Sequence, residues 1–342
     1  MDKYNNPIIT VLMPVYNCAL YIKEAIDSIL IQSFEDFEFL IIDDASIDNT
    51  VSIIKSYNDH RIQLIEKPKN SGYTNSLNYG LSIAKGKYIA RMDGDDISLP
   101  ERFSKQYDFM EANEEVVVCG SSFSNIGENL HHILPQWHDD IKINLLRNNT
   151  IVHPSVLIRK ETLISNAIEY DTKMEPAEDY DLWVRLLGIG RLHNLQDCLL
   201  KYRVHDMQVS NLSKIRQDEA MYKIRIKLLM YLAELSSEQK RVYLKMILNV
   251  KTLSFHDFLI FLSLKSALIE ANKNNFFDKQ GFVSYWSGLE NSFVSFYFKN
   301  RTDYSFLHSK QYLSIHSQLN NKLDAKNFIK LALKSIFNYK VK

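Results

Sequence analysis

The sequence has few cysteines, and those it has are far apart. Only Cys18, Cys119 and Cys198 occur in 342 residues, and no two of them form a CxxC pair. Their odd number and wide spacing exclude a disulfide framework and a zinc site built on thiolates. The cysteine content is therefore typical of a protein in a reducing compartment, and we expect a cytoplasmic location.

Long apolar runs are also absent. The most apolar stretch, residues 258–264, is short and lies between Asp257 and Lys265, whereas a membrane-spanning helix needs about 20 apolar residues. The N-terminus shows no charged region followed by an apolar one, so a secretory signal peptide is not predicted. We therefore expect any contact with a membrane to be peripheral, at the cytoplasmic face.

The chain has no excess of charge of either sign. It contains 41 basic and 41 acidic residues, so its formal net charge is zero. A nucleic-acid partner is not expected, because such a partner requires a basic surface. A GxGxxG motif after a strand is missing as well, which excludes a dehydrogenase of the dinucleotide-binding type.

What the first 95 residues do contain is a regular alternation of strand and helix patterns. Strands and helices are predicted in turn at residues 8–13, 19–32, 37–42, 48–57, 62–65, 71–85 and 88–92. This order predicts an α/β domain with a mainly parallel sheet covered by helices on both faces. Ligands bind such sheets at the carboxyl ends of the strands. Three of the predicted strands run directly into polar clusters, at residues 14–17, 43–46 and 93–96.

The strongest single motif is the acidic cluster Arg-Met-Asp-Gly-Asp-Asp at residues 91–96. Its three carboxylates repel each other, which raises their pKa values unless a cation is bound. A divalent ion such as Mn²⁺ or Mg²⁺ prefers oxygen ligands and keeps positions open for the phosphates of a substrate. The cluster therefore predicts a metal site, although a solvated acidic turn has the same composition.

A second cluster, at residues 43–50, follows another predicted strand. Asp43 would lie just past the strand end, where a carboxylate can accept a hydrogen bond from a base N–H or a ribose hydroxyl. Ser46 and Asp48 are typical of helix starts, so we predict a structural role for them.

Together these motifs make the sequence similar to the family 2 glycosyltransferases, which have the GT-A fold. The resemblance covers roughly residues 7–210. It rests on blocks that occur in the family's order, at residues 11–17, 42–50, 70–72, 86–96, 153–156 and 178–183. It implies an enzyme that transfers a sugar, of the type that builds bacterial surface polysaccharides.

By position, the resemblance implies how a UDP-sugar donor would be bound. Pro14, Tyr16 and Asp43 match residues that hold the base and the ribose. Asp93 and Asp95 match the acidic motif that contacts the ribose and the Mn²⁺ or Mg²⁺ ion bridging the diphosphate. The expected nucleotide-sugar contacts are Pro14, Tyr16, Asn17, Asp43, Asp44, Asn70, Gly72, Arg91 and Asp93, and the expected metal ligands are Asp93, Asp95 and His205.

The chain departs from the family at residues 75–78, which read Asn-Ser-Leu-Asn. Many members carry Ala-Arg-Asn there, so the usual arginine is absent. Arg91 is the substitute that we predict for it.

The resemblance places the catalytic base at Asp179, next to Glu178. The attacking hydroxyl must lose a proton, and a divalent ion stabilises the charge that develops on the UDP leaving group. One base and one leaving-group metal suit a single displacement that inverts the anomeric centre. His153, Glu178 and Trp183 are expected on the acceptor side. A carboxylate at a helix N-terminus also fits a structural role for Asp179.

The last third of the chain has a different character. After about Asn211, glycine and proline almost disappear and long helical patterns follow. We therefore expect a GT-A catalytic domain at residues 1–210 and a mostly helical C-terminal region at 211–342, associated with a membrane or an acceptor. Residues 301–342 carry eight Lys or Arg and two Asp. The pattern at 324–337 predicts a basic amphipathic helix, which can lie on an anionic membrane or pack on the catalytic domain.

The function that we expect is the inverting, metal-dependent transfer of a hexose or N-acetylhexosamine from a UDP-sugar to a saccharide acceptor. From the family, we expect an acceptor linked to polyprenyl diphosphate and a product such as an O-antigen, a capsule or an exopolysaccharide. The alternative is a protein on the same fold that binds a nucleotide sugar without catalysis. The presence of both the acidic motif and Asp179 favours the enzyme.

Overall fold

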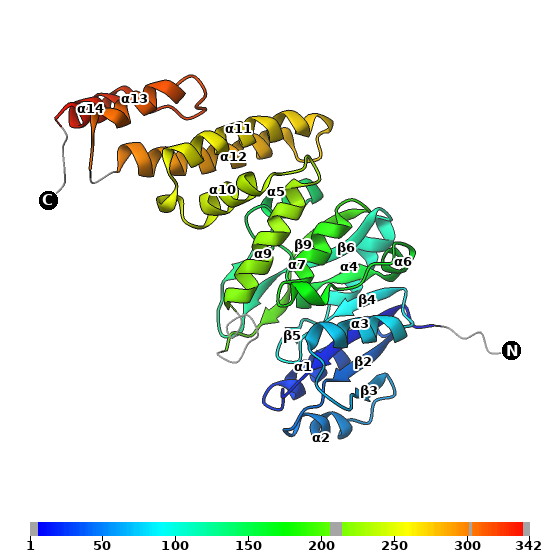
Figure 1. Ribbon diagram of the computed structural model, residues 1–342. Helices are drawn as coiled ribbons and strands as arrows, with labels where there is room; N and C mark the ends of the chain where they lie inside the picture. Colours follow the sequence, from blue (N-terminus) through cyan, green and yellow to red (C-terminus); the bar gives the residue numbers. More distant parts are fainter. Residues whose placement is uncertain (1–5, 206–213, 301–302, 338–342) are drawn as a thin grey trace. The chain divides into compact units, whose positions relative to one another are not determined.

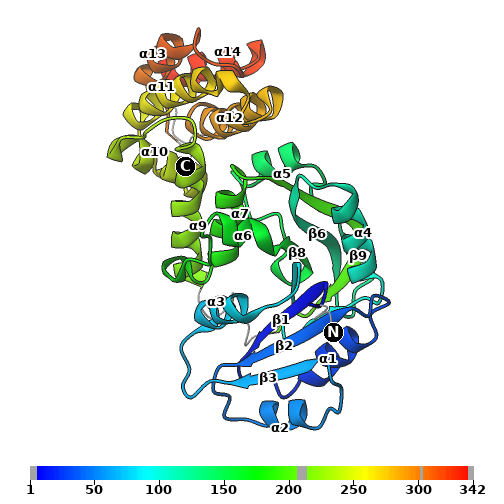
Figure 2. The same ribbon diagram turned by 90° about the vertical axis from the view of Figure 1, so that its right-hand side faces the viewer.

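A computed structural model of the protein describes residues 6–205, 214–300 and 303–337. The chain divides into two compact units, Met1–Arg225 and Ile226–Lys342. Over the described residues, the strands lie in the first unit and the second unit is helical (Figures 1 and 2). The boundary predicted after residue 210 lies outside the described residues, and helix α9 (Lys214–Leu229) runs across the division between the units.

The first unit is built on one mixed sheet. Its described strands are β1 (Ile9–Val15), β2 (Phe37–Asp43), β3 (Ile62–Glu66), β4 (Tyr88–Arg91), β5 (Ile97–Ser98), β6 (Val116–Asn125), β7 (His131–His132), β8 (Leu157–Arg159) and β9 (Arg191–Tyr202). Their order is β3-β2-β1-β4-β8-β6-β9-β5, with β7 paired to β6. The first four strands in this order are parallel, as are β6 and β9, and the other pairs are antiparallel. The predicted α/β class with a mainly parallel sheet is confirmed.

Helices cover both faces of this sheet. They are α1 (Ile22–Leu30), α2 (Thr50–Lys55), α3 (Tyr73–Ile83), α4 (Arg102–Ala112), α5 (His138–Asn144), α6 (Lys160–Ser165) and α7 (Glu178–Leu186). Successive side chains of a strand point to opposite faces, so Val11 of β1 joins the buried cluster that contains Ile26 of α1. Leu12 points to the other face, where a Cβ at Gly80 of α3 would lie 2.1 Å from its Cδ1 atom. The glycine therefore lets α3 pack directly on β1.

The second unit is a helical bundle. Its described α-helices beyond α9 are α10 (Ser237–Leu248), α11 (Phe255–Ala271), α12 (Lys279–Val294), α13 (Phe306–Ile315) and α14 (Ala325–Ile336). Aromatic rings fill its core: Phe258 of α11 stacks on Phe293 of α12 at 3.8 Å, and Trp286 lies 5.8 Å from Tyr243 of α10. None of the helices in the described parts of the chain is long and apolar enough to cross a bilayer. The predicted helical C-terminal region is confirmed.

Candidate active site

Polar contacts join the loops that follow β1 and β2. The backbone N–H of Asn17 donates to Ser46 Oγ (2.9 Å), and Asn17 Oδ1 accepts a hydrogen bond from the N–H of Ile47 (2.9 Å). Asp43 is buried at the end of β2, where its Oδ2 atom accepts a hydrogen bond from the N–H of Ser46 (3.0 Å). Its Oδ1 atom is buried without a hydrogen-bond partner among the described residues. Such an atom carries a desolvation cost, so Asp43 Oδ1 is suited to accept a hydrogen bond from a ligand.

Pro14 and Tyr16 lie at the same edge of the sheet. Pro14 is buried in β1 opposite Ile42, and β4 pairs with β1 only as far as Leu12. No residue of β4 therefore lies opposite Pro14, and the sheet loses no hydrogen bond to β4 through the N–H that proline lacks. Tyr16 follows β1 and is 45% exposed. Its ring offers an apolar face on which a flat base can stack.

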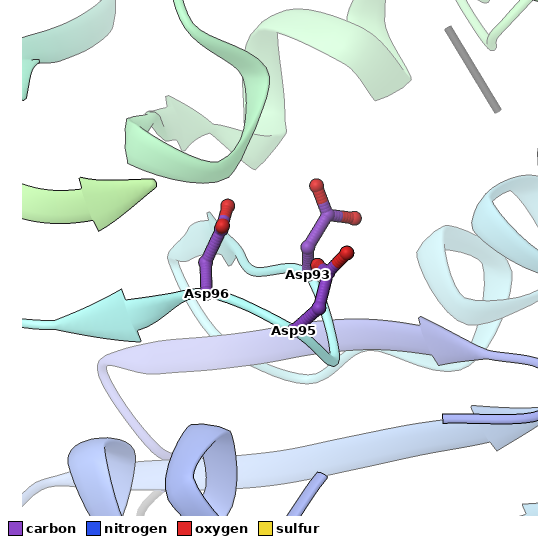
Figure 3. Close-up of side chains that lie close together, drawn as sticks. All are labelled: Asp93, Asp95 and Asp96. Atoms are coloured by element: carbon purple, nitrogen blue, oxygen red, sulfur yellow. The ribbon is translucent and has the colours of Figure 1, made fainter. Parts of the chain in front are cut away.

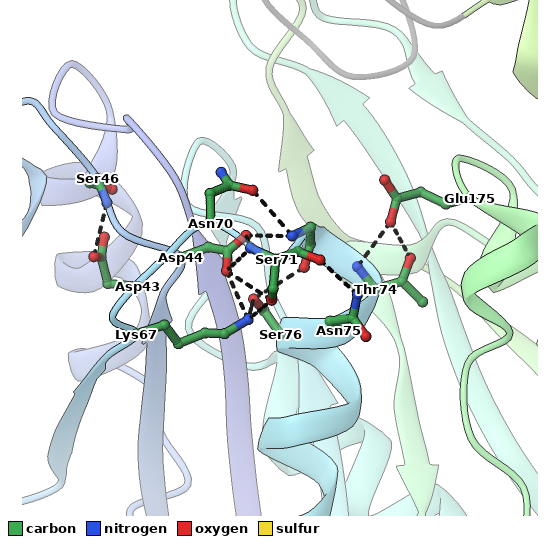
Figure 4. A network of polar contacts seen from close by, with 11 residues as sticks. Asp43, Asp44, Ser46, Lys67, Asn70, Ser71, Thr74, Asn75, Ser76 and Glu175 are labelled. Carbon is green, nitrogen blue, oxygen red and sulfur yellow. Dashed lines mark hydrogen bonds and ion pairs between the residues drawn. The ribbon is translucent and has the colours of Figure 1, made fainter.

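Asp44 organises the loop between β3 and α3 (Figure 4). Its carboxylate pairs with Lys67 Nζ at 2.8 Å and accepts hydrogen bonds from the N–H groups of Ser71 (3.1 Å) and Gly72 (2.9 Å). Burial acts to raise the pKa of Asp44, but these contacts outweigh it and hold the pKa below its usual value. Gly72 caps α3 with a φ of 94° and a ψ of 153°, a region open essentially only to glycine. Asn70 Oδ1 also accepts a hydrogen bond from the N–H of Gly72 (3.1 Å). The loop between β3 and α3 is therefore tied to Asp44 at the end of β2.

Glu175 holds the start of α3 from the other side of the site (Figure 4). Its Oε2 atom accepts hydrogen bonds from Thr74 Oγ1 (2.7 Å) and from the N–H of Thr74 (3.3 Å). Glu175 comes from the segment that leads into α7. The contact therefore links the loop beside Asp44 to the helix that carries Asp179.

The acidic cluster lies in the turn between β4 and β5, and its three side chains point to the same side (Figure 3). One carboxylate oxygen from each of Asp93, Asp95 and Asp96 lies within 4.8 Å of the other two. Burial, together with repulsion from the neighbouring carboxylates, raises the pKa of Asp93 and of Asp96, although Arg91 opposes this. A bound cation would relieve that repulsion, and an all-carboxylate set fits Mn²⁺ or Mg²⁺. Asp96 belongs to the acidic cluster predicted from the sequence, but it is not among the metal ligands expected from the family resemblance.

Arg91 is buried next to the cluster. Its Nη1 atom forms an ion pair with Asp93 Oδ2 at 2.5 Å. Its guanidinium carbon also lies 5.5 Å from the centre of the Tyr73 ring, in the first turn of α3. Arg91 therefore places a positive charge beside the helix in which the family's usual arginine is absent.

The residues after β9 close the other side of the acidic turn. The backbone N–H of Arg203 donates to Asp96 Oδ1 (2.8 Å), and Arg203 Nε donates to the carbonyl oxygen of Asp95 (2.7 Å). His205 Nε2 lies 2.9 Å from Asp95 Oδ2. The ring of Tyr21 supports this segment, 5.0 Å from the His205 ring. The fold thus brings His205 to the acidic cluster.

The candidate base lies in the first turn of α7, where the helix dipole favours a negative charge. Asp179 is partly buried; its Oδ2 atom accepts a hydrogen bond from Asn149 Nδ2 (2.8 Å), and Oδ1 accepts one from the N–H of Tyr180 (2.7 Å). Burial raises the pKa of Asp179 to about 6. Burial and the charge of Asp179 raise the pKa of Glu178 to about 8. Asp179 is therefore ionised at neutral pH and basic enough to accept a proton.

His153 packs against α7, where its ring meets the ring of Trp183 edge to face. His153 Nε2 lies 2.8 Å from the hydroxyl of Tyr170. Burial, followed by the charge of Arg91, lowers the pKa of His153 well below its usual value, so its imidazole is neutral. Trp183 is fully buried, with its ring 5.8 Å from that of His153. Trp183 therefore supports His153 from the core.

An open pocket brings the acidic turn and the candidate base together. Asp93, from the turn after β4, and Asp179, from α7, both line it. The other described residues that line it are Phe123, Asn149, Ile151, Val152, His153, Pro154 and Tyr202. Sequence reasoning missed Phe123, Asn149 and Tyr202, because no local motif marks them. They reach the pocket only through the arrangement of β6, β9 and the segment before β8.

Comparison with known proteins assigns the family. The model of the family described as Glycosyl transferase family 2 matches residues 10–165. An uncharacterised glycosyltransferase of Haemophilus influenzae is 33% identical over 235 residues, covering 65% of this chain and 73% of that protein. The O-antigen biosynthesis glycosyltransferase WbnJ of Escherichia coli is 33% identical over 226 residues, covering 64% of this chain and 88% of that protein. The chain belongs to glycosyltransferase family 2.

Solved structures agree on the fold of this glycosyltransferase. The crystal structure of S. aureus TarS residues 1–349 with UDP-GlcNAc matches with a TM-score of 0.57 at 18% identity, covering 97% of this chain and 92% of that one. The mannosyltransferase PcManGT of Pyrobaculum calidifontis, in complex with GDP-Man and Mn²⁺, matches with a TM-score of 0.52 at 16% identity, covering 98% and 89%. The predicted GT-A fold is therefore confirmed.

Proposed function

We propose that this family 2 glycosyltransferase transfers a hexose or N-acetylhexosamine from a UDP-sugar to a saccharide acceptor, with inversion and with the help of a divalent ion. The observation that carries the proposal is the pocket lined by both Asp93 and Asp179. Transfer requires a leaving-group site and a base within reach of one sugar. The acidic turn and the first turn of α7 meet that requirement.

The donor side is supported by the groups left available at the ends of β1 and β2. Asp43 Oδ1 is a buried acceptor that has no hydrogen-bond partner among the described residues. The Tyr16 ring is about half exposed. Two residues later the chain is held again, where the N–H of Cys18 donates a hydrogen bond to Thr50 Oγ1. These groups suit the N–H edge and the flat face of a uracil base. UDP-GlcNAc is bound by TarS, which has the same fold. We therefore propose UDP as the nucleotide.

Asp93, Asp95 and His205 are the residues that we propose to hold Mn²⁺ or Mg²⁺, and Asp96 adds a further carboxylate to the group. The raised pKa values of Asp93 and Asp96 support a cation there, because it would remove the repulsion that raises them. When bound, the ion supplies positive charge for the leaving diphosphate. PcManGT, which shares the fold, holds Mn²⁺ with its nucleotide sugar.

Asp179 removes the proton from the attacking hydroxyl in this proposal. Asn149 orients its carboxylate, and Glu178 remains protonated beside it because its pKa is higher. A retaining mechanism through a covalent glycosyl-enzyme would require a nucleophile on the opposite face of the sugar. Among the described lining residues, Asp93 is the one other carboxylate, and it is paired with Arg91. This supports a single inverting displacement.

The acceptor and pathway are proposed from the family and its members. WbnJ is an O-antigen biosynthesis enzyme, and we propose that the present protein also builds an O-antigen, a capsule or an exopolysaccharide. The acceptor would be linked to polyprenyl diphosphate at the cytoplasmic face of the membrane. We further propose that residues 1–210 are catalytic and that residues 211–342 contact the membrane or the acceptor.

A donor panel tests this function. The purified protein is incubated with Mn²⁺, each common nucleotide sugar and a synthetic lipid-diphosphate-linked GlcNAc or GalNAc, and nucleotide release is measured. We expect acceptor-dependent release from one UDP-sugar, abolished by EDTA. Asp179→Asn should lower kcat by about 10²–10⁴-fold and leave UDP affinity unchanged.

Asp140→Asn is the matched control, because Asp140 is an exposed carboxylate in α5 outside the pocket. It should keep full activity. Normal turnover by Asp179→Asn would contradict the assigned base. Metal-dependent UDP binding without release from any donor and acceptor would favour the non-catalytic alternative, and failure to bind UDP would exclude the donor site proposed here.

A further inference from the structure

Helix α14 packs into the second unit with one face. Leu331 and Ser335 on this face are buried, and the ring of Phe328 lies 5.7 Å from that of Tyr312 in α13. The hydroxyl of Tyr312 accepts a hydrogen bond from the N–H of Leu323, just before α14 (2.7 Å). These contacts fix which side of α14 points outward.

The outward side of α14 is apolar. Ile329, Leu333 and Ile336 are each more than half exposed, and Phe337 directly after the helix is 77% exposed. Spacings of four and three residues place the first three in one stripe along the helix. An apolar stripe that faces solvent is unfavourable unless another surface covers it.

Helix α13 lies alongside α14 (Figures 1 and 2). It also exposes apolar side chains. Phe306 and Leu313 are 56% and 58% exposed, and their spacing of seven residues places them on one side of the helix. Lys310 lies between them on this side, with its Nζ atom 5.1 Å from the centre of the Phe306 ring. We call the exposed side chains of Phe306, Lys310, Leu313, Lys326, Ile329, Lys330, Leu333 and Ile336 the α13–α14 face.

The charge around this face is mainly positive. Residues 304–337 contain five lysines and one acidic residue, Asp324. Asp324 caps α14, where its side chain accepts a hydrogen bond from the N–H of Asn327 (2.7 Å). Lys326 and Lys330 are exposed one turn apart along the edge of the apolar stripe. The apolar side chains are therefore bordered by cations.

We propose that the α13–α14 face binds the surface of an anionic lipid bilayer. Apolar side chains flanked by lysines match such a surface, where the chains enter the headgroup layer and the ammonium groups meet lipid phosphates. A second copy of the chain fits less well, because a symmetric contact through this face would bring lysines against lysines. The inference rests on the membrane contact proposed above for residues 211–342 and assigns it to one face. Its evidence comes from the second unit alone, apart from the proposed donor and metal sites.

Vesicle co-sedimentation of the full chain tests the proposal. We compare vesicles of neutral phosphatidylcholine with vesicles that contain roughly 30% anionic phosphatidylglycerol. The protein should bind the anionic vesicles and release them as salt is added. Lys326→Glu/Lys330→Glu should weaken partitioning by at least about 25-fold, since each cation contributes about fivefold. Ile329→Ser/Leu333→Ser should weaken binding in low salt as well.

The matched control is Lys273→Glu/Lys279→Glu, which makes the same charge change at two exposed lysines elsewhere in the second unit. It should bind like the unchanged protein. Equal loss in the control, or equal binding to neutral vesicles, would overturn the proposal. A dimer in sedimentation velocity that Ile329→Ser/Leu333→Ser dissociates would identify a second copy as the occupant and overturn it too. Far-UV circular dichroism checks that each variant is folded.

Discussion

Asp179 combines two influences on one carboxyl group. Burial raises its pKa, while the N–H of Tyr180 and the amide of Asn149 stabilise its ionised form. The result is a pKa of about 6. A base must be ionised to accept a proton, so its activity is present above this pKa and is lost below it.

The pH dependence of transfer follows from this value. We expect kcat/KM for the acceptor to fall about tenfold per pH unit below pH 6, because the fraction of ionised Asp179 falls in that way. Initial rates are measured between pH 4.5 and 8. UDP affinity is measured at each pH as well, which separates this effect from weaker binding of the donor. A rate independent of pH across this range would show that Asp179 does not act as the base.

Asn149 allows a sharper test at the same position. Asn149→Ala removes a hydrogen bond to the ionised carboxylate, so the pKa of Asp179 should rise. The acid side of the pH–rate profile should move to higher pH by about 1–2 units, the equivalent of one hydrogen bond to a charged group. Asn148→Ala, at the exposed neighbouring position, should leave the acid side of the pH–rate profile unchanged. A lower rate without a shift of the pH–rate profile would mean that Asn149 acts only in packing or in substrate binding.

At the scale of structural elements, the turn between β4 and β5 brings three mutually repelling carboxylates together. The folded state raises the pKa of Asp93 and Asp96 above the unfolded value, mainly through burial. A raised carboxyl pKa means that ionisation opposes folding. The resulting loss of stability sets in as pH rises above the unfolded pKa of about 4.

Metal addition should therefore stabilise the protein through this turn. We expect Mn²⁺ to raise the melting temperature at pH 7.5, because an ion bound at the folded cluster, as proposed above, would relieve the repulsion. Asp95→Asn should remove most of that increase, whereas Asp108→Asn, at an exposed position in α4, should retain it. Thermal unfolding with and without EDTA measures the effect. An equal increase in the Asp95→Asn variant would place the ion elsewhere.

The start of α3 depends on the backbone of one glycine. Gly72→Ala should destabilise the protein by about 1–3 kcal/mol, because φ is 94° there and an alanine is strained in that region. It should also weaken UDP binding, since the N–H of Gly72 donates a hydrogen bond to Asp44, which directly follows Asp43. Denaturant unfolding measures the first effect and calorimetry the second. Gly288→Ala, within α12 and with open space at its Cβ, should be neutral or slightly stabilising.

At the scale of the whole molecule, the two units have separate cores. The second unit also contains a buried ion pair between Lys265 of α11 and Glu290 of α12. Glu290 accepts hydrogen bonds from the N–H groups of Asn320 (2.7 Å) and Asn321 (3.0 Å) as well. Removing one member of a buried pair leaves an uncompensated charge in the core.

Lys265→Met should therefore destabilise the second unit selectively. We expect a loss of about 3–5 kcal/mol in the urea transition of this unit, with unchanged UDP affinity in the first. Lys273→Met, at an exposed lysine nearby in the chain, should have little effect. A single transition that shifts together with the loss of UDP binding would show that the two units unfold as one.

The sequence by itself determined the order of the elements and the class of the enzyme. Strand and helix periodicities are local, so β1 to β4 and the helices between them could be predicted from neighbouring residues. The same locality placed Asp43 and Asp93 at strand ends, and Asp179 in the first turn of a helix. Parallel strands bring such ends to one edge of a sheet, so much of the candidate site could be predicted.

Only the tertiary structure decided which distant residues complete the site. Asn149 lies 30 residues from Asp179, and Arg203 lies 107 residues from Asp96. Contacts of this kind depend on the order β8-β6-β9 in the sheet, which no local pattern specifies. The outward side of α14 is a similar case. The sequence of α14 is compatible with packing against the protein and with binding to a membrane. Only the burial of Leu331 and Ser335 shows which face of the helix remains exposed. Burial depends on neighbours that are far away in the chain, so no local pattern could reveal it.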